Sequence, residues 1–324
     1  MSATAPMRLS EATPAQRRTL LAAMLGWMLD AFDVMLYALV LAHVMRDLGM
    51  TKATAGLLGT LTLLASGIGG VLFGFVADRI GRTRALMLTI LTYSVCSFAS
   101  GLATSVLMLA AIRFVLGLGM GGEWNTGATL VAETWPTHLR AKALAIVQSS
   151  WAIGYALSAV VAGVVLRYSN WRAVFFVGVL PALVTLWIRR QVPESELWQQ
   201  HREQAVRQRR GESAAPFSEL FSRQYIKPTF VLLFLNLFGM FGWWGLFTWL
   251  PSYLTLPVAQ GGRGFPTAQM TTMLVWLNLT GMLPGYISYG FVADKLGRRK
   301  AFALYLIMAA LLVPLYARVR GQPH

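Results

Sequence analysis

Long apolar runs recur along the whole chain, and they constrain its fold more than any other feature of the sequence. Nine such runs are bounded by charged or turn-forming residues: 21–45, 55–77, 85–103, 106–131, 143–166, 172–188, 229–256, 268–292 and 301–317. A helix of about 20 residues crosses the roughly 30 Å hydrocarbon core of a bilayer. Only 13% of the residues are charged, against about 25% in an ordinary soluble domain. The sequence therefore predicts an all-α polytopic membrane protein.

The basic residues follow the predicted topology. With the N-terminus placed in the cytoplasm, the five cytoplasmic segments hold 20 Lys and Arg residues and the opposite side holds seven. Because Lys and Arg gather on the cytoplasmic side of membrane proteins, we expect a cytoplasmic N-terminus, and a bacterial cytoplasmic (inner) membrane as the location. Topology and anionic lipid headgroups then explain the net charge of +15, so a nucleic-acid partner is not expected.

A repeated segment divides the chain. Gly74-Phe-Val-Ala-Asp-Arg-Ile-Gly-Arg-Thr-Arg returns 216 residues later as Gly290-Phe-Val-Ala-Asp-Lys-Leu-Gly-Arg-Arg-Lys, with seven of eleven positions identical. Each copy joins the second and third helices of its half, and two repeated halves are typical of alternating-access transporters. The predicted units are an N-terminal tail 1–20, a six-helix bundle 21–188, a cytoplasmic linker 189–228 and a three-helix bundle 229–324.

The repeat resembles the signature of the major facilitator superfamily, which implies two six-helix bundles. Nine of the expected twelve transmembrane helices are then present, and the counterparts of helices four to six are expected to be missing. Glu133-x-x-Pro-x-x-x-Arg140 and Pro193-Glu194-Ser195 resemble cytoplasmic elements of the sugar and organic-acid porters. The resemblance assigns a cytoplasmic gate to Gly74, Asp78, Arg79, Gly81, Arg82, Glu133, Arg140, Glu194, Asp294, Gly297 and Arg298.

Ionisable side chains fall inside the first and fourth predicted spans. Asp30, Asp33 and Tyr37 share a face of the first helix by their spacing, and the fourth helix contains Arg113 and Glu123. Placing an ionisable group inside a membrane costs free energy, so such groups usually mark functional sites. Leu29-Asp-Ala-Phe-Asp resembles the Asp-Gly-Phe-Asp element of proton symporters for aromatic acids, sialic acid and lactate, although position 31 is alanine. We predict proton coupling by Asp33, Asp30, Glu123 and Arg113, with Asp33 favoured because it is nearer mid-span.

The predicted function is proton-coupled symport of a small organic anion: a monocarboxylate, sialic acid or an aromatic acid. Candidate substrate-binding residues are Tyr37, Arg113, Asn125, Trp151, Tyr155, Asn236, Trp244 and Asn278. A sugar or drug carrier of the same fold, or a truncated product that does not transport, stays open as an alternative. We expect a monomer that is not an enzyme, has no metal or organic cofactor, and has a small anion, a proton and the lipid bilayer as partners.

Overall fold

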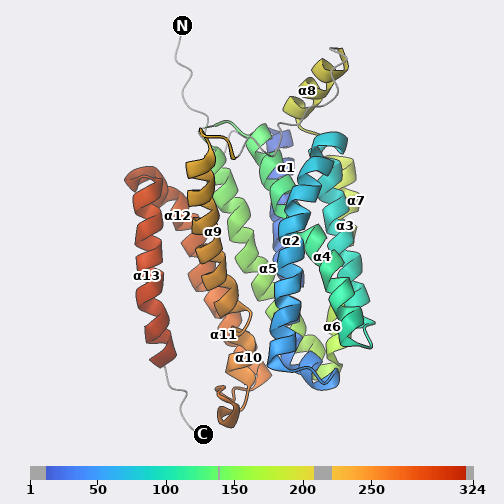
Figure 1. The fold of residues 1–324 in the computed structure, drawn as a ribbon, viewed down its shortest axis with the longest axis vertical. Helices are drawn as coiled ribbons and strands as arrows, with labels where there is room; N and C mark the ends of the chain where they lie inside the picture. Colours follow the sequence, from blue (N-terminus) through green and yellow to red (C-terminus); the bar gives the residue numbers. More distant parts are fainter. Residues whose placement is uncertain (1–11, 138, 208–220, 319–324) are drawn as a thin grey trace.

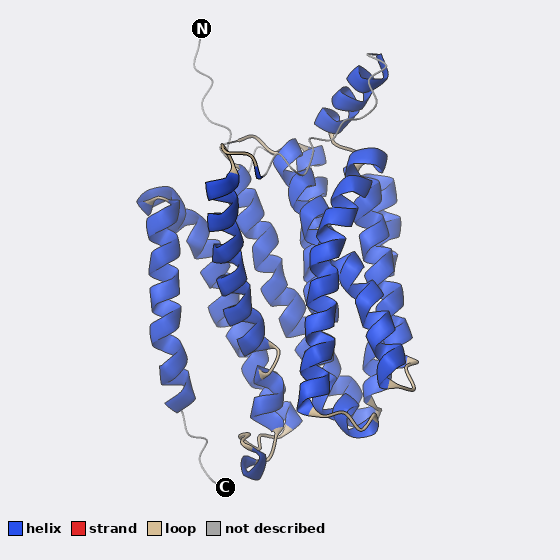
Figure 2. Cartoon of the chain, viewed as in Figure 1, coloured by secondary structure: helices blue, strands red, loops and turns tan. Residues whose placement is uncertain are grey.

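The computed structural model describes residues 12–137, 139–207 and 221–318, and within these ranges all regular structure is helical (Figure 2). The helices run roughly parallel in two groups, with the first seven on one side and α9 to α13 on the other (Figure 1). The fold is thus all-α with two bundles.

The first bundle contains seven helices. Their bounds are α1 Pro14–Asp47, α2 Lys52–Ile80, α3 Arg82–Gly101, α4 Val106–Thr134, α5 Arg140–Tyr168, α6 Trp171–Val177 and α7 Ala182–Gln191. The segment expected as one span, 172–188, is divided into α6 and α7. Pro181 stands at the break and lacks the N–H that an uninterrupted helix would require.

Local side chains define where three of these helices begin. Thr13, Thr51 and Ser105 each accept a hydrogen bond from the backbone N–H three residues further on, at the start of α1, α2 and α4. Such caps satisfy N–H groups that have no partner within the helix. The α1 helix consequently begins at Pro14, several residues before the apolar run itself.

The second group begins after a peripheral helix, α8 Glu196–Arg207, which projects from one end of the molecule (Figure 1). The other elements are α9 Ile226–Phe247, α10 Leu250–Thr255, η3 Val258–Gln260, α11 Thr267–Trp276, η4 Leu277–Met282, α12 Leu283–Leu296 and α13 Arg298–Arg318. The run 268–292 forms one rod from α11 to α12, and η4 is a π-helical turn within it. Pro284 follows that turn and cannot donate the next helical hydrogen bond.

Within the part of the chain that the structure describes, six segments are long and apolar enough to cross a membrane by length and composition: α1, α2, α4, α5, the α6–α7 pair and the α9–α10 pair. The three other expected spans are also helical and correspond to α3, the rod from α11 to α12, and α13.

Glycines allow α2 and α4 to pack with their backbones in contact. A Cβ on Gly121 would overlap the carbonyl oxygen of Ser66, and one on Gly117 would overlap that of Thr62. On the opposite helix, a Cβ on Gly69 would overlap the carbonyl of Leu118. Small residues at helix interfaces permit this close approach in membrane proteins.

We therefore expect Gly121→Ala to lower the free energy of unfolding by about 1–3 kcal/mol, as overpacking does in a tight interface. The measurement is unfolding of the purified chain by sodium dodecyl sulfate, followed by circular dichroism. Gly239→Ala on α9 is the matched control, because no described atom lies within 4 Å of a Cβ at that position. Equal stability of the two variants would contradict the packing argument.

The two bundles meet mainly along α5, which packs against α11, η4 and α12. Gly163 lies beside Thr271 in this contact, and Gly290 lies beside Ala145. On the other side of α1, α9 faces α2 and α4 across a cavity.

Candidate functional site

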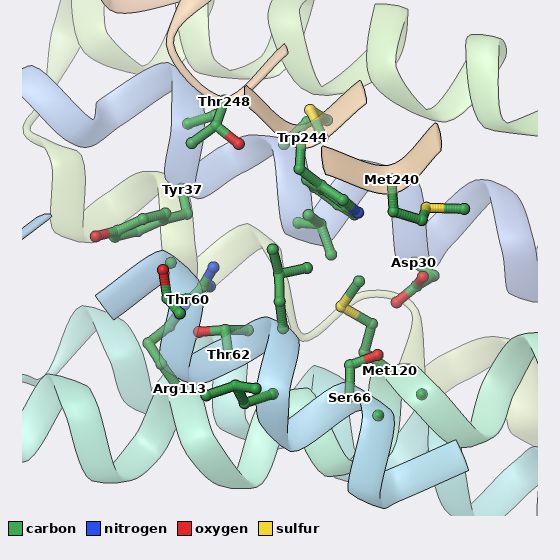
Figure 3. A pocket seen from close by; sticks show the side chains of 18 of the residues that line it. Asp30, Tyr37, Thr60, Thr62, Ser66, Arg113, Met120, Met240, Trp244 and Thr248 are labelled. Carbon is green, nitrogen blue, oxygen red and sulfur yellow. The ribbon is translucent and has the colours of Figure 1, made fainter. Parts of the chain in front are cut away.

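A cavity of about 900 Å³ lies between the two bundles. Residues of α1, α2 and α4 form one wall, and residues of α9 with its C-terminal cap form the other. In Figure 3, Trp244 points into the middle of the site, with Tyr37 and Arg113 on one side and Asp30 and Met240 on the other. A cavity of this size accommodates a small molecule.

Four charged residues are buried next to this cavity. Asp30 and Asp33 of α1 are 0% and 1% exposed, and Arg113 and Glu123 of α4 are 2% and 1% exposed. The arrangement results from direct packing of α1 on α4: a Cβ at Gly26 would overlap the carboxylate of Glu123. Burying charges is costly, so such groups persist where they pair, exchange protons or bind a ligand.

Among the described residues that line the cavity, Arg113 is the only cation. Its guanidinium carbon lies 4.3 Å from the centroid of the Tyr37 ring, and Asp33 is its acidic electrostatic neighbour. Its Nε and Nη1 atoms have no hydrogen-bond partner among the described residues. A buried guanidinium with unused donors is suited to bind an incoming carboxylate.

The three acids occupy different positions relative to the cavity. Asp30 lines it, whereas Asp33 and Glu123 lie behind the lining residues. The carboxylate of Asp33 lies beside the Ser97 hydroxyl and the backbone at Gly178. Asp30 interacts electrostatically with both Asp33 and Glu123. The acids therefore form a continuous buried group that reaches the cavity through Asp30.

The predicted substrate-binding residues divide into two sets. Tyr37, Arg113, Asn125 and Trp244 line the cavity. The remaining four do not: Trp151, Tyr155 and Asn278 are buried behind the lining, and Asn236 is exposed on α9.

Several gate residues come together at the end of the first bundle where α2 meets α3. Arg82 Nη1 lies 2.5 Å from Asp78 Oδ1, and its Nη2 lies 3.1 Å from Glu133 Oε1. Burial by itself would lower the pKa of Arg82, but these hydrogen bonds outweigh it and raise the pKa above its usual value. Gly81 joins the two helices at φ +103°, a conformation that favours glycine.

Glu194 joins the same group by capping α3. Its Oε1 accepts a hydrogen bond of 2.8 Å from the Arg82 backbone N–H, and the Thr83 N–H donates to the same carboxylate. A negative charge at a helix N-terminus is stabilised by the helix dipole as well as by these bonds.

Glu194→Ala is expected to destabilise the fold by about 1–2 kcal/mol, because it leaves the first N–H groups of α3 without this acceptor. Detergent unfolding monitored by circular dichroism measures the change. Glu196→Ala is the matched control, since Glu196 is exposed at the start of α8. If the Glu194 cap does not contribute to the free energy of unfolding, both variants will be as stable as the parent.

No hydrogen bond or ion pair among the described residues joins the other predicted gate residues to this group. Gly297, at φ +83°, joins α12 to α13, which Arg298 begins. Arg140 donates from Nε to the Trp135 carbonyl, Arg79 is exposed, and Gly74 has no described neighbour within 4 Å of a Cβ. The side chain of Asp294 lies outside the described residues.

The cavity also contains residues that the sequence did not assign to it. Trp27 of α1, Trp124 of α4 and Thr248 at the end of α9 are lining residues. The sequence signal was weak but present: Trp27 precedes Asp30 by one helical turn, and Trp124 directly follows Glu123.

Comparison with known proteins agrees with this architecture. The family model of the Major Facilitator Superfamily matches residues 23–322. The sialic acid transporter NanX of Escherichia coli is 36% identical over 94% of this chain and 72% of its own length. The cis,cis-muconate transport protein of Acinetobacter baylyi is 33% identical over 90% of this chain and 70% of its own length.

The fold likeness extends to solved structures. The D-xylose–proton symporter has a TM-score of 0.67 and 19% identity, covering 87% of this chain and 70% of that protein. Together with the buried charges and the interbundle cavity, these matches show that the chain belongs to the major facilitator superfamily and is an integral membrane transport protein rather than an enzyme.

Proposed function

We propose that the protein is a proton-coupled symporter of a small organic anion, which binds in the interbundle cavity. The observation that carries this proposal is Arg113: it is 2% exposed, lines the cavity, and has guanidinium atoms without a hydrogen-bond partner in the described chain. A substrate carboxylate would satisfy those donors and neutralise the buried charge.

The buried acids at the cavity, Asp30, Asp33 and Glu123, supply the coupling in this proposal. Asp33 lies in the electrostatic field of Arg113, and Asp30 connects it with Glu123. An anion bound at Arg113 competes with Asp33 for the positive charge, so binding favours uptake of a proton by the acid group. The loaded carrier is then close to neutral in this region, which lowers the electrostatic cost of closing around the substrate.

The relatives support an anionic substrate. One is named a sialic acid transporter and another a cis,cis-muconate transport protein, and both compounds are carboxylates. The group of Asp78, Arg82, Glu133 and Glu194 would stabilise the cytoplasmic end of the bundle during the cycle.

The excess of Lys and Arg at that end supports a cytoplasmic N-terminus in an inner membrane. Because one chain supplies both walls of the cavity, the proposal requires only a monomer.

Uptake by the full chain in liposomes tests the proposal. With the exterior at pH 5.5 and the interior at pH 7.5, radiolabelled sialic acid, a carboxylate too hydrophilic to cross the bilayer by itself, should accumulate in proteoliposomes above the level in protein-free vesicles. A protonophore should remove the excess. Protein-dependent uptake that is equally large with and without the proton gradient would refute proton coupling. Efflux driven by inward protons would favour a drug carrier, and binding without any flux would favour a product that does not transport.

A further inference from the structure

The carboxylate of Asp33 lies at a buried junction between α1, α3 and the end of α6. A Cβ on Gly178, the residue that follows α6, would overlap the Ser97 hydroxyl of α3 and would lie 2.8 Å from Asp33 Oδ1. Asp33 is 1% exposed and Ser97 is 0% exposed. The carboxylate and the hydroxyl therefore meet at one backbone position, away from the residues that line the cavity.

The buried hydroxyl groups of α3 are of two kinds. Thr89 and Ser100 each donate a hydrogen bond to a carbonyl in the preceding turn of the helix. Ser94 and Ser97 are 0% exposed, and neither hydroxyl oxygen has a hydrogen-bond partner among the described residues. A buried hydroxyl without a partner costs free energy. Of these two serines, Ser97 is the one that lies beside an ionisable group, Asp33.

Ser97 suits Asp33 in both of its protonation states. Both carboxylate oxygens of Asp33 also lack a hydrogen-bond partner in the described chain. A serine hydroxyl can donate to an ionised carboxylate, and its oxygen can accept from a protonated one. We infer that Ser97 is a positioning residue for proton coupling, whose hydroxyl binds the ionised carboxylate of Asp33 and so determines the pH at which Asp33 takes up its proton.

Other ionisable groups also surround Asp33. They are Arg113 of α4, Asp30 of α1, and Tyr93 and Cys96 of α3, with Glu123 of α4 next to Asp30. The helices α2, α5, α6 and α7, which also pack on α1, carry their charged residues at their ends. All of these groups are the same in the parent and in a Ser97 variant, so a comparison of the two isolates the hydroxyl.

The inference rests on the proposed function for its role in transport, but its main test does not require transport. Infrared spectroscopy of the full chain in lipid nanodiscs follows the C=O stretching band of protonated carboxylic acids as the pH is varied. The part of this band that Asp33→Asn removes belongs to Asp33, and its intensity gives the pH midpoint of protonation. Ser97→Ala should raise that midpoint by about one pH unit, because it removes a hydrogen bond that favours the ionised form.

Matched variants distinguish this effect from a loss of packing. Ser100→Ala removes another hydroxyl of α3 that is 0% exposed but bonded to its own helix, and it should leave the midpoint unchanged. Ser97→Thr keeps the hydroxyl and should keep the midpoint of the parent. Ser97→Cys has a weaker donor of similar shape and should also raise the midpoint, which provides a second reading if Ser97→Ala does not fold. Helical circular dichroism and a single size-exclusion peak identify the folded variants.

The outcomes separate this inference from the proposed function. A midpoint that is unchanged or lowered in the folded Ser97 variants would overturn the role of Ser97, as would a band that Asp33→Asn leaves intact. Uptake of radiolabelled sialic acid into proteoliposomes then tests the coupling, and its pH of half-maximal rate should rise together with the midpoint in Ser97→Ala. A raised midpoint without proton-driven uptake would leave the interaction of Ser97 with Asp33 standing and refute the proposed coupling. Proton-driven uptake with an unmoved midpoint would do the reverse.

Discussion

Replacing Arg113 by leucine is expected to weaken benzoate binding by roughly 10- to 100-fold, because a charge-assisted hydrogen bond contributes about 1.5–3 kcal/mol. The position of Arg113 in the structure explains why a large loss of affinity is expected. It is buried, it faces the cavity, and its Nε and Nη1 atoms find no partner among the described residues. The measurement is equilibrium binding of radiolabelled benzoate to the purified chain in nanodiscs.

Two further variants make this result interpretable. Arg113→Lys keeps the positive charge but loses the planar fork, so its affinity should lie between those of the parent and the leucine variant. Arg167→Leu, at the far end of α5, removes an exposed arginine and should leave binding unchanged. If Arg113→Leu binds benzoate as tightly as the parent, Arg113 does not hold the substrate carboxylate.

Asp33→Asn is expected to abolish proton-driven accumulation while leaving exchange of substrate across the membrane. The side chain of asparagine cannot take up a proton in this pH range, so the variant stays neutral at residue 33 and no longer responds to the gradient. The parent should accumulate more substrate as the external pH falls, since protonation accompanies inward loading. One pH unit supports about tenfold accumulation for one proton per anion, and the variant should show none.

The experiment compares pH-driven uptake of radiolabelled sialic acid with its counterflow into liposomes preloaded with unlabelled sialic acid, which the bilayer retains. Asp30→Asn should produce a similar loss, because Asp30 connects the acid group to the cavity. Glu203→Gln, on the exposed face of α8, should retain the acid stimulation of the parent. Full acid stimulation in Asp33→Asn would show that Asp33 is not a coupling residue.

The helices were the most predictable part of the molecule, because a bilayer imposes a minimum length on apolar runs. Their interruptions were less predictable. Pro181 divides the sixth run into α6 and α7, and η4 places a π-helical turn inside the eighth. No charged residue interrupts the interior of either run, so hydropathy alone gives no sign of the break. A proline within an apolar run does not by itself show whether the helix kinks or divides.

The different positions of Asp30 and Asp33 relative to the cavity could not be predicted from their spacing either. Residues three apart on a helix differ by about 60° around its axis, whereas residues seven apart differ by about 20°. Asp30 and Tyr37 therefore line the cavity together, and Asp33 turns toward Ser97 on α3. Sequence spacing predicted one face for all three, but the edge of the cavity falls within that face.

The ring contacts of Trp27 with Trp124 and Trp151 could not have been predicted from the sequence of any single helix. Trp27, Trp124 and Trp151 lie on three different elements, and only the packing of α1 against α4 and α5 brings their rings together. Helical periodicity identifies which side of one helix is apolar, but it carries no information about the height at which two helices meet.

The contact between Trp151 and Trp244 gives the molecule a built-in optical reporter. These rings belong to different bundles and lie 6.1 Å apart, whereas Trp27 and Trp151 lie 4.7 Å apart within one bundle. Exciton coupling between indoles falls steeply with distance, so relative movement of the bundles would change the first coupling and leave the second as an internal reference. The bundle rearrangement would thus be visible in the circular dichroism of the unlabelled protein.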